Sequence, residues 1–428
     1  MGFDEQLAVG LGARDAAPAQ GTATELRSPP ERLLLTAWEQ ELRTSGIQGL
    51  ERAVEGIHPE RLTAWFDADP GLQEVAVLKT CQRLLLLALT EDAEPADRLG
   101  DRLASMGVWG ASNDRAAIHH LFRVAAGFES IATGEREVRD QVRLAASTVV
   151  SRHPRPLLRR VLLEAARAAA DVEVAGAHSV ADLGADWLRS RLSDRSVPIL
   201  VIGGGRVARR VVERLRGLAD VTMLYHSRPP EPAWAAERRV RSRRFGDLRA
   251  VLASSEGVVA AAKASGRLIS LEDLPPPGSG GPRWFVDLGM PRNIDPRVGG
   301  RPGTELVDLE GLQPSIPRDP AALSEAQRKL AEAADESAVR FARAAAEPWV
   351  RALRNRAEAV RSAEFEQALE FAGPVPDLAR AAFHRMSERI VTRLLAGPTE
   401  ELRGLSPEPD HDPRRQKLLD RFSPPDDP

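Results

Sequence analysis

A single cysteine, Cys81, lies in a short polar segment between two apolar runs. The runs Val75–Leu78 and Leu84–Leu89 are typical of strands, and a short polar segment between such strands usually lies at a sheet edge or turn. Lys79 and Arg83 flank the cysteine, so we expect a partly exposed thiol in a positive field, which favours the nucleophilic thiolate. The alternative is that Cys81, like most free cysteines, is a small buried apolar side chain.

A glycine-rich segment forms a second candidate site. It follows the apolar run 198–202, which is typical of a buried strand, and precedes a predicted helix that continues through Leu215. Its pattern is G-x-G-x-x-A, and its residues are Gly203, Gly204, Gly205, Arg206, Val207 and Ala208. Gly203 permits a tight turn, Gly205 lets a pyrophosphate approach the backbone, and Ala208 packs the helix on the sheet. This setting predicts a dinucleotide site; the alternative is a doubly wound domain that merely has a tight turn.

The end of the next predicted strand, Val221–Tyr225, favours NADP over NAD. An NAD site normally has Asp or Glu at this point to hold the ribose hydroxyls. This chain has His226, Ser227 and Arg228 instead, and so offers a hydroxyl and a guanidinium suited to a 2′-phosphate. Arg228 could also be an ordinary surface arginine.

A nicotinamide site together with an activated thiol suggests one reaction class. An ester carbonyl accepts the thiolate, the alcohol leaves, and the thioester is reduced by hydride to an aldehyde. A second interpretation is an NADP-dependent oxidoreductase that acts on a free small molecule, with the thiol as a bystander. A third is a divergent protein that binds dinucleotide without turnover; the family resemblance described below extends this alternative to a non-catalytic dimer that binds dinucleotide or tRNA.

Composition limits the other possibilities. The 428 residues carry a formal net charge of −3, so no overall field indicates a nucleic acid or an anionic membrane. One cysteine excludes an intrachain disulfide, and no Cys/His cluster suggests a metal site. No apolar run approaches about 18 residues, so we expect no membrane span and a cytoplasmic location.

The pattern along the chain indicates an α/β protein of several domains. Helix signals cover residues 115–126, with Gly127 as a stop, and 134–150. A long helical region, 157–192, precedes alternating strands and helices, which predict a parallel sheet. We expect these divisions: a disordered N-terminus 1–30, a first domain 31–155, a linking helix 156–195, a dinucleotide domain 196–315, a helical domain 319–405 with a kink at Pro348, and a disordered tail 406–428.

Five stretches, in order over about residues 35–405, resemble motifs of the glutamyl-tRNA reductase family. They are T-C-Q-R at 80–83, H-L-F-R-V-A-A-G-F-E-S at 120–130, the G-E pair at 134–135 with Gln141, F-V-D-L-G-M-P-R-N-I-D-P at 285–296, and R-L-L-A-G-P-T at 393–399. The resemblance implies an α+β catalytic domain, a Rossmann-type NADP domain and a helical dimerisation domain strung on a long helix. It also implies a homodimer that reduces glutamyl-tRNA with NADPH to glutamate-1-semialdehyde, the first step of tetrapyrrole synthesis, and possible transfer of this product to an aminomutase.

The resemblance also assigns roles to individual residues. Cys81 would be the nucleophile, and His120 would assist proton movement. The pocket for the glutamyl group would comprise Thr80, Gln82, Arg83, Ser130, Glu135, Arg136, Glu137 and Gln141. Arg83 suits the side-chain carboxylate, because its fork of donors grips a carboxylate bidentately. Without the resemblance, His120 would be a satisfied helix histidine, Glu135 a helix-start acid and Gln141 a surface residue.

The chain departs from the family motifs at several positions. Gln82 replaces an asparagine, Leu84 and Leu85 replace a T-E pair, and Ala396 replaces a histidine. The family's N-H pair near the N-terminus corresponds loosely to Glu41 and Leu42. The family's basic stretch corresponds to residues 168–174, which lack its Lys and Arg. These departures bear on tRNA contacts more than on the chemistry.

At the C-terminal end, helical spacing of apolar residues predicts a surface that needs a partner. The residues are Val350, Leu353, Val360 and Leu369. A second copy of the chain would supply that partner, although the same chain could also cover them.

Overall fold

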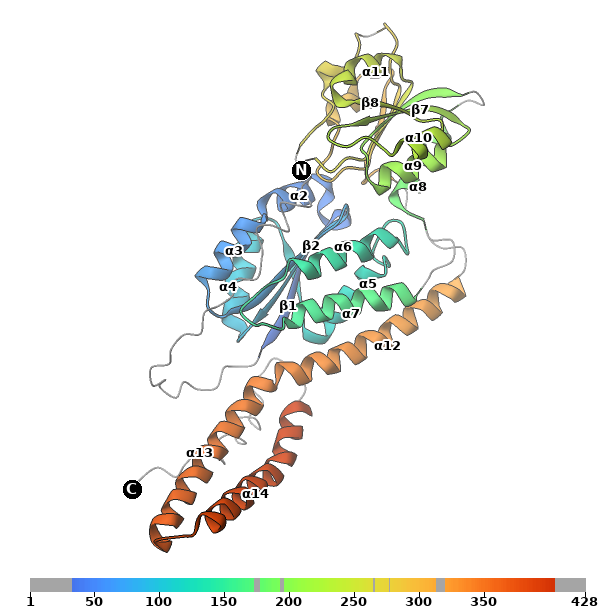
Figure 1. Ribbon diagram of the computed structural model, residues 1–428. Coiled ribbons are helices and arrows are strands. Elements are labelled where there is room, and N and C mark those ends of the chain that lie inside the picture. The colour runs from blue at the N-terminus through green and yellow to red at the C-terminus, as the bar shows by residue number, and fades with distance from the viewer. Residues whose placement is uncertain are drawn as a thin grey trace.

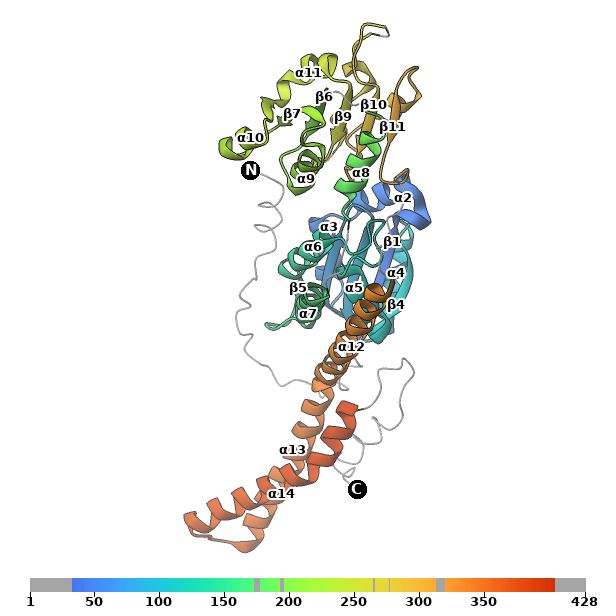
Figure 2. The same cartoon turned by 90° about the vertical axis from the view of Figure 1, so that its right-hand side faces the viewer.

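The computed structural model describes residues 33–172, 178–192, 196–264, 266–276, 278–312 and 320–404. The two predicted disordered segments, 1–30 and 406–428, lie outside the described residues. Three parts follow one another in space: a dinucleotide-type sheet domain, a smaller sheet domain and a long helical arm (Figures 1 and 2).

The first domain is built on a five-stranded antiparallel sheet with the order β4-β1-β3-β2-β5. Its strands are β1 (Leu34–Glu41), β2 (Leu72–Lys79), β3 (Arg83–Thr90), β4 (Trp109–Asn113) and β5 (Val150–Ser151). Every residue of the central strand β3 is buried, because helices cover both faces of the sheet. This double cover explains why the strand is a continuous apolar run rather than an alternating one.

Two groups of helices cover the sheet. One face packs against α2 (Leu42–Gly56), α3 (Pro59–Ala68) and α4 (Ala93–Ala104). The other face packs against α5 (Asp114–Ala125), α6 (Arg136–Ser147) and α7 (Leu157–Asp171). The predicted helix stop Gly127 has φ +72°, which a glycine adopts without strain.

The second domain is a six-stranded parallel sheet with the order β11-β10-β9-β6-β7-β8, which confirms the predicted α/β class. Its strands are β6 (Val197–Ile202), β7 (Ala219–Tyr225), β8 (Arg241–Arg244), β9 (Gly257–Ala260), β10 (Trp284–Asp287) and β11 (Glu305–Val307). Its helices are α9 (Arg206–Leu215), α10 (Pro232–Glu237) and α11 (Leu248–Ser254), with 3₁₀ turns at Phe245–Asp247, Leu271–Asp273 and Pro296–Gly300.

The predicted single linking helix over 156–195 is wrong. The stretch contains two helices, α7 and α8 (Val180–Arg189), and Val172, His178 and Ser179 are not helical. Helix α8 starts beside the first domain, since the Val180 amide donates to Glu135 Oε1 at 3.2 Å. It packs on α9 of the second domain, where Asp182 forms an ion pair with Arg210 at 2.6 Å.

The helical arm comprises α12 (Pro320–Ala345), α13 (Glu347–Ala372) and α14 (Asp377–Gly404). Helix α12 lies along α5 and α7, and the α13–α14 pair extends away from both sheets (Figures 1 and 2). The kink predicted at Pro348 corresponds to the break at Ala346 between α12 and α13. No helix in the described ranges is long and apolar enough to cross a membrane.

The four apolar positions predicted to need a partner differ in their exposure. Val350 and Leu353 are fully buried within the chain against Leu395 and Leu402, so the prediction is wrong for them. Val360 and Leu369 are half-buried. Other apolar side chains of the α13–α14 pair are exposed instead: Phe371, Leu378, Phe383, Met386, Ile390 and Leu394.

Candidate functional site

The candidate nucleophile lies at the tip of the hairpin that joins β2 and β3. The tip is closed by backbone and side-chain contacts of Thr80: its amide donates to the Arg83 carbonyl at 2.9 Å, and its hydroxyl accepts from the Gln82 and Arg83 amides at 3.1 Å each. Cys81, held between these residues, is half-buried. Cys81 as a whole residue is thus partly exposed, as the sequence predicts.

Gln82 connects the thiol to the rest of the site. Its side-chain nitrogen lies 3.7 Å from the Cys81 sulfur and 3.4 Å from Glu135 Oε2, and it donates to both. Its side-chain oxygen accepts from the Ile131 amide at 2.7 Å. A donor aimed at the sulfur stabilises the thiolate relative to the thiol.

The expected positive field around Cys81 is absent, because both neighbouring cations have other partners. The Lys79 ammonium donates to the backbone carbonyls of Val54, at 3.1 Å, and Ile57. Burial lowers the pKa of Lys79 to about 8. Burial of the thiol, and next the carboxyl of Glu135, raise the pKa of Cys81. The predicted lowering of the thiol pKa is therefore wrong for this conformation.

The carboxyl group of Glu135 is itself buried, and burial raises its pKa to about 8. Its two oxygens accept from the Val180 amide and from Gln82, so it joins the hairpin tip to the start of α8. At neutral pH most of the Glu135 population is protonated, which removes most of its repulsion of a thiolate.

Arg83 is the most heavily engaged residue of the site and is 2 % exposed. One guanidinium nitrogen, Nη1, lies 2.6 Å from Glu39 Oε1, and the other, Nη2, donates to the Glu129 carbonyl at 2.6 Å and to Glu41 Oε1 at 3.2 Å. His120 Nε2 lies 2.8 Å from Glu39 Oε2. Burial raises the pKa of Glu39, but His120 and Arg83 outweigh burial and hold that pKa below its usual value.

Reasoning from the sequence missed Glu39 as a site residue and gave Glu41 only a loose correspondence to a family motif. The signal was present in the strand pattern. Glu41 pairs directly with Arg83 across β1 and β3, and Glu39 lies two residues away on the same face. Charged residues that continue an inward-facing alternation indicate a buried ion pair rather than a solvated strand end.

The other predicted pocket residues lie around the hairpin tip to different degrees. Ser130 is buried in the segment that contacts both Arg83 and Gln82. Gln141 has a buried side-chain oxygen with no hydrogen-bond partner among the described residues. Arg136 is exposed at the start of α6, and Glu137 is half-buried one residue later. The orphaned oxygen of Gln141 fits a donor on a bound ligand.

The glycine segment has the geometry that a pyrophosphate needs. Gly203 has φ +121°, and a Cβ there would lie 2.5 Å from the Ala261 carbonyl oxygen, so only glycine fits. Gly205 caps the N-terminus of α9, and no atom lies within 4 Å of its ideal Cβ position. Ala208 is fully buried, as close packing of α9 on the sheet requires. The open space at a helix N-terminus fits the phosphates of a dinucleotide.

Ion pairs join the second domain, including its glycine segment, to the first domain. Arg206 pairs with Asp140 on α6, and Arg292 pairs with Glu51 on α2 at 2.7 Å. Cys81, Ala261 and Met290 pack against one apolar cluster that extends from the first sheet into the second. The hairpin tip is also joined through Gln82 and Glu135 to the first residue of α8, so Cys81 lies beside the point where the chain passes from the first domain to the second. Ser227 and Arg228 are exposed beyond the end of β7, and the Arg228 carbonyl oxygen lies 3.7 Å from the ideal Cβ position of Gly204.

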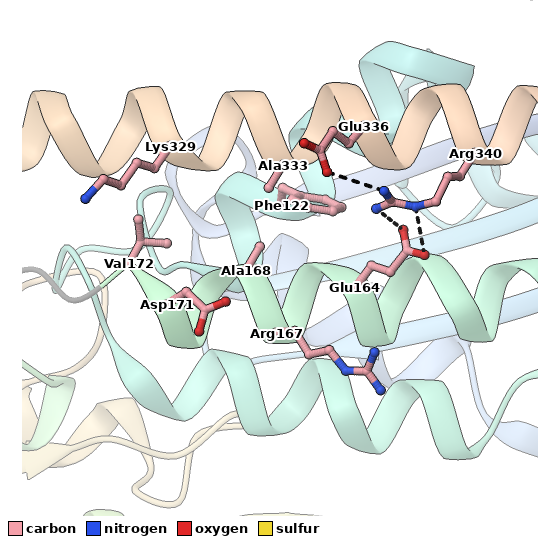
Figure 3. A pocket seen from close by; sticks show the side chains of 10 residues that line it. All are labelled: Phe122, Glu164, Arg167, Ala168, Asp171, Val172, Lys329, Ala333, Glu336 and Arg340. Carbon is pink, nitrogen blue, oxygen red and sulfur yellow. Dashed lines mark hydrogen bonds and ion pairs between the residues drawn. The ribbon is translucent and has the colours of Figure 1, made fainter.

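A cavity of about 480 Å³ lies elsewhere, between α5, α7 and α12 (Figure 3). Its lining residues are Phe122, Glu164, Arg167, Ala168, Asp171, Val172, Lys329, Ala333, Glu336 and Arg340. Within it, Glu164 accepts from Ser337 at 2.6 Å and pairs with Arg340 at 3.1 Å, contacts that dock α12 on α7. None of the predicted site residues lines this cavity, so we assign it to helix packing.

A half-buried cysteine beside the junction with a doubly wound glycine-loop domain places the chain among dinucleotide-dependent oxidoreductases. Family models agree: the glutamyl-tRNA reductase N-terminal domain matches residues 43–175, shikimate/quinate 5-dehydrogenase matches 188–315, and the glutamyl-tRNA reductase dimerisation domain matches 325–422. The dehydrogenase match supports a nicotinamide dinucleotide as cofactor. The chain belongs to the glutamyl-tRNA reductase family.

Individual relatives carry the same description. A glutamyl-tRNA reductase of Roseiflexus castenholzii is 31 % identical over 358 residues, covering 78 % of this chain and 84 % of its own. Glutamyl-tRNA reductase 2 of a Nocardioides species is 33 % identical over 372 residues, covering 78 % and 80 %. Among solved structures, the reductase of Methanopyrus kandleri aligns over 91 % of this chain and 98 % of its own at 20 % identity, with a TM-score of 0.45.

The pairing of Cys81 with Glu135 leads to a prediction about thiol reactivity. Glu135→Gln removes the charge that appears on Glu135 above about pH 8 while keeping an oxygen for the Val180 amide. Alkylation of Cys81 by iodoacetamide at pH 9 should then become several-fold faster, because the thiolate no longer faces a carboxylate. The matched control is Glu137→Gln, a more weakly coupled neighbour, which should have a smaller effect. An unchanged rate in Glu135→Gln would show that Glu135 does not set the thiol pKa.

Proposed function

We propose that this protein reduces glutamyl-tRNA to glutamate-1-semialdehyde with NADPH, through a thioester on Cys81, as the first step of tetrapyrrole synthesis by the five-carbon route. The observation that carries the proposal is the position of Cys81, in a chain of this family, at the tip of a hairpin that Gln82 and Glu135 connect to α8, the helix that packs on the dinucleotide domain. A thiol that must first take an acyl group and then present it for reduction needs this location between two domains.

The first half of the reaction is acyl transfer. The Cys81 sulfur attacks the carbonyl carbon of the ester between the glutamyl group and the tRNA, a C–S bond forms, and the C–O bond to the tRNA breaks. The tRNA hydroxyl leaves with the proton that the thiol gives up. Bound NADPH supplies the hydride that reduces the thioester, and the C–S bond then breaks to return the thiolate and release the aldehyde.

Residues of the site support these steps by position. Gln82 donates to the sulfur and favours its anionic form. Arg83 is the anchor for the substrate carboxylate, and His120, beside Glu39, moves the proton between sulfur and leaving hydroxyl. The released aldehyde would pass to a semialdehyde aminomutase.

We infer that the working form is a homodimer built on the α13–α14 pair. The exposed apolar side chains of this pair include Phe371 and Leu378, which are 96 % and 81 % exposed. Helix α14 also presents exposed arginines and α13 exposed glutamates, at positions 385, 389 and 393 and at positions 364, 366 and 370. An apolar stripe flanked by opposite charges suits a second copy of the same chain.

The covalent step makes Cys81→Ser the direct test of the mechanism. Formation of semialdehyde from glutamyl-tRNA and NADPH should fall at least about a thousandfold, because a hydroxyl is a far weaker nucleophile than a thiolate. Without NADPH, the wild type should retain radiolabelled glutamate covalently and the variant should not. Unchanged NADPH affinity and thermal unfolding serve as the folding control. A folded variant with substantial NADPH-dependent activity would exclude the thioester.

The choice of cofactor rests on Arg228. A hydrogen bond from a guanidinium to a 2′-phosphate contributes about 1.5–3 kcal/mol, roughly a tenfold to hundredfold preference for NADPH over NADH. Arg228→Ala should narrow this preference by weakening the binding of NADPH but not of NADH. Arg243, on β8, is also exposed, and Arg243→Ala should leave the preference unchanged. Dissociation constants from fluorescence quenching measure both effects. Equal affinities of the wild type for the two cofactors would contradict the assignment.

Introducing negative charges among the exposed apolar side chains of α14 tests whether this surface forms the dimer interface. Phe383→Glu combined with Leu394→Glu should convert the dimer to a monomer, because both side chains would be buried between two copies. Leu218→Glu, at an exposed apolar residue of the second domain, is the control and should remain a dimer. Light scattering distinguishes the two masses. A dimeric double variant would place the interface elsewhere.

A further inference from the structure

The anchor proposed for the substrate carboxylate already holds two carboxylates of the chain itself. We propose that Glu41 occupies the place of the substrate's side-chain carboxylate, and that substrate binds by exchange, displacing Glu41 from Arg83. This inference rests on the proposed function, in which the substrate is a glutamyl ester and Arg83 binds its side chain. It adds Glu41 as a residue that controls the affinity for the substrate.

Crowding around Arg83 requires that one group leave. Nη1 contacts Glu39, and Nη2 contacts Glu41 and the Glu129 carbonyl, while Arg83 itself is 2 % exposed. Two carboxylates already exceed the single positive charge of the guanidinium. A third carboxylate in the same buried space would meet like charge, and both hydrogens of Nη2 are already donated.

Glu41 is the carboxylate that can leave. Glu39 is held twice, at 2.6 Å from Arg83 and 2.8 Å from His120, whereas Glu41 has a single contact with Arg83 at 3.2 Å. Glu41 also lies at the end of β1, directly opposite Arg83, and is 23 % exposed. The displaced side chain can therefore swing into solvent without breaking the sheet.

The surroundings of Glu41 make its ionised form unfavourable where it now lies. The groups that act on it are Arg83, Glu39, Arg43 and Glu129. Burial raises the pKa of Glu41, an effect that Arg83 only partly offsets, and the Glu39 carboxylate raises it further. Both of these unfavourable effects are lost when the side chain moves into solvent. The release of Glu41 therefore costs little beyond its single contact with Arg83.

The test compares Glu41→Gln with the wild type in the full-length protein. The glutamine cannot repel the incoming carboxylate, so KM for glutamyl-tRNA should fall about tenfold. Glu55→Gln, an exposed glutamate on α2, is the control for a general change of charge and should leave KM unchanged. A KM that rises in Glu41→Gln, or that keeps the wild-type value, would overturn the exchange.

A second measurement does not depend on turnover. The α-methyl ester of glutamate should protect Cys81 from iodoacetamide, and protection should require about tenfold less ester in Glu41→Gln, while the α-methyl ester of glutamine should protect both proteins alike. If the glutamate ester protects both proteins at the same concentration, the exchange is wrong and the proposed function stands. If the wild type neither reduces glutamyl-tRNA nor distinguishes the two esters, the proposed function fails and the exchange fails with it.

Discussion

The buried guanidinium of Arg83 is the constraint on which the first domain depends. Burial of an unpaired charge lowers the stability of a folded protein by several kcal/mol unless partners surround the charge. The guanidinium of Arg83 is such a charge, and Arg83 is the first residue of the central strand β3. Its partners come from β1, from the segment after α5 and, through Glu39, from His120 on α5. These contacts form only if the register of β1 against β3, the position of α5 and the conformation of the hairpin tip are all as observed. Because Cys81 lies in that hairpin tip, the same contacts fix its position.

Local patterns predicted much of the fold because the relevant information is local. The hairpin around Cys81 follows from two apolar runs, and the strand–turn–helix at Gly203 follows from backbone geometry that only glycine permits. The single linking helix was wrong because helical periodicity gives no sign of where a helix must stop. Helix α8 starts where Asp182 accepts from the Ser179 amide at 2.9 Å and where Glu135, 45 residues before Val180, accepts from the first amide of the helix. Likewise, spacing could not tell that Leu353 is covered by its own chain.

The site was predicted less completely than the fold for a related reason. The predicted residues Cys81, Gln82 and Glu135 do lie together, but the effect of their surroundings on the thiol pKa is opposite to the predicted one. A charged side chain next to Cys81 in the sequence does not act on the thiol if it forms hydrogen bonds with groups elsewhere in the chain. Lys79 donates to carbonyls at the end of α2, and Arg83 donates to glutamates on β1. Such contacts span more than 20 residues and appear only after the sheet register is known.

The Cys81 thiol and the Glu135 carboxyl each make ionisation of the other less favourable. Because Glu135 also binds the start of α8, the residue that affects the thiol is part of the contact between the domains. Two anionic groups in contact with one glutamine side chain do not both ionise readily, so the two titrate as a pair. A protonated Glu135 leaves Cys81 free to become the thiolate, and an ionised Glu135 opposes it. The same carboxyl accepts the first amide of α8, which packs on the helix that begins at the glycine segment. One buried carboxyl therefore serves two purposes: it sets how readily the Cys81 thiolate forms, and it holds the start of the helix on which the dinucleotide domain packs.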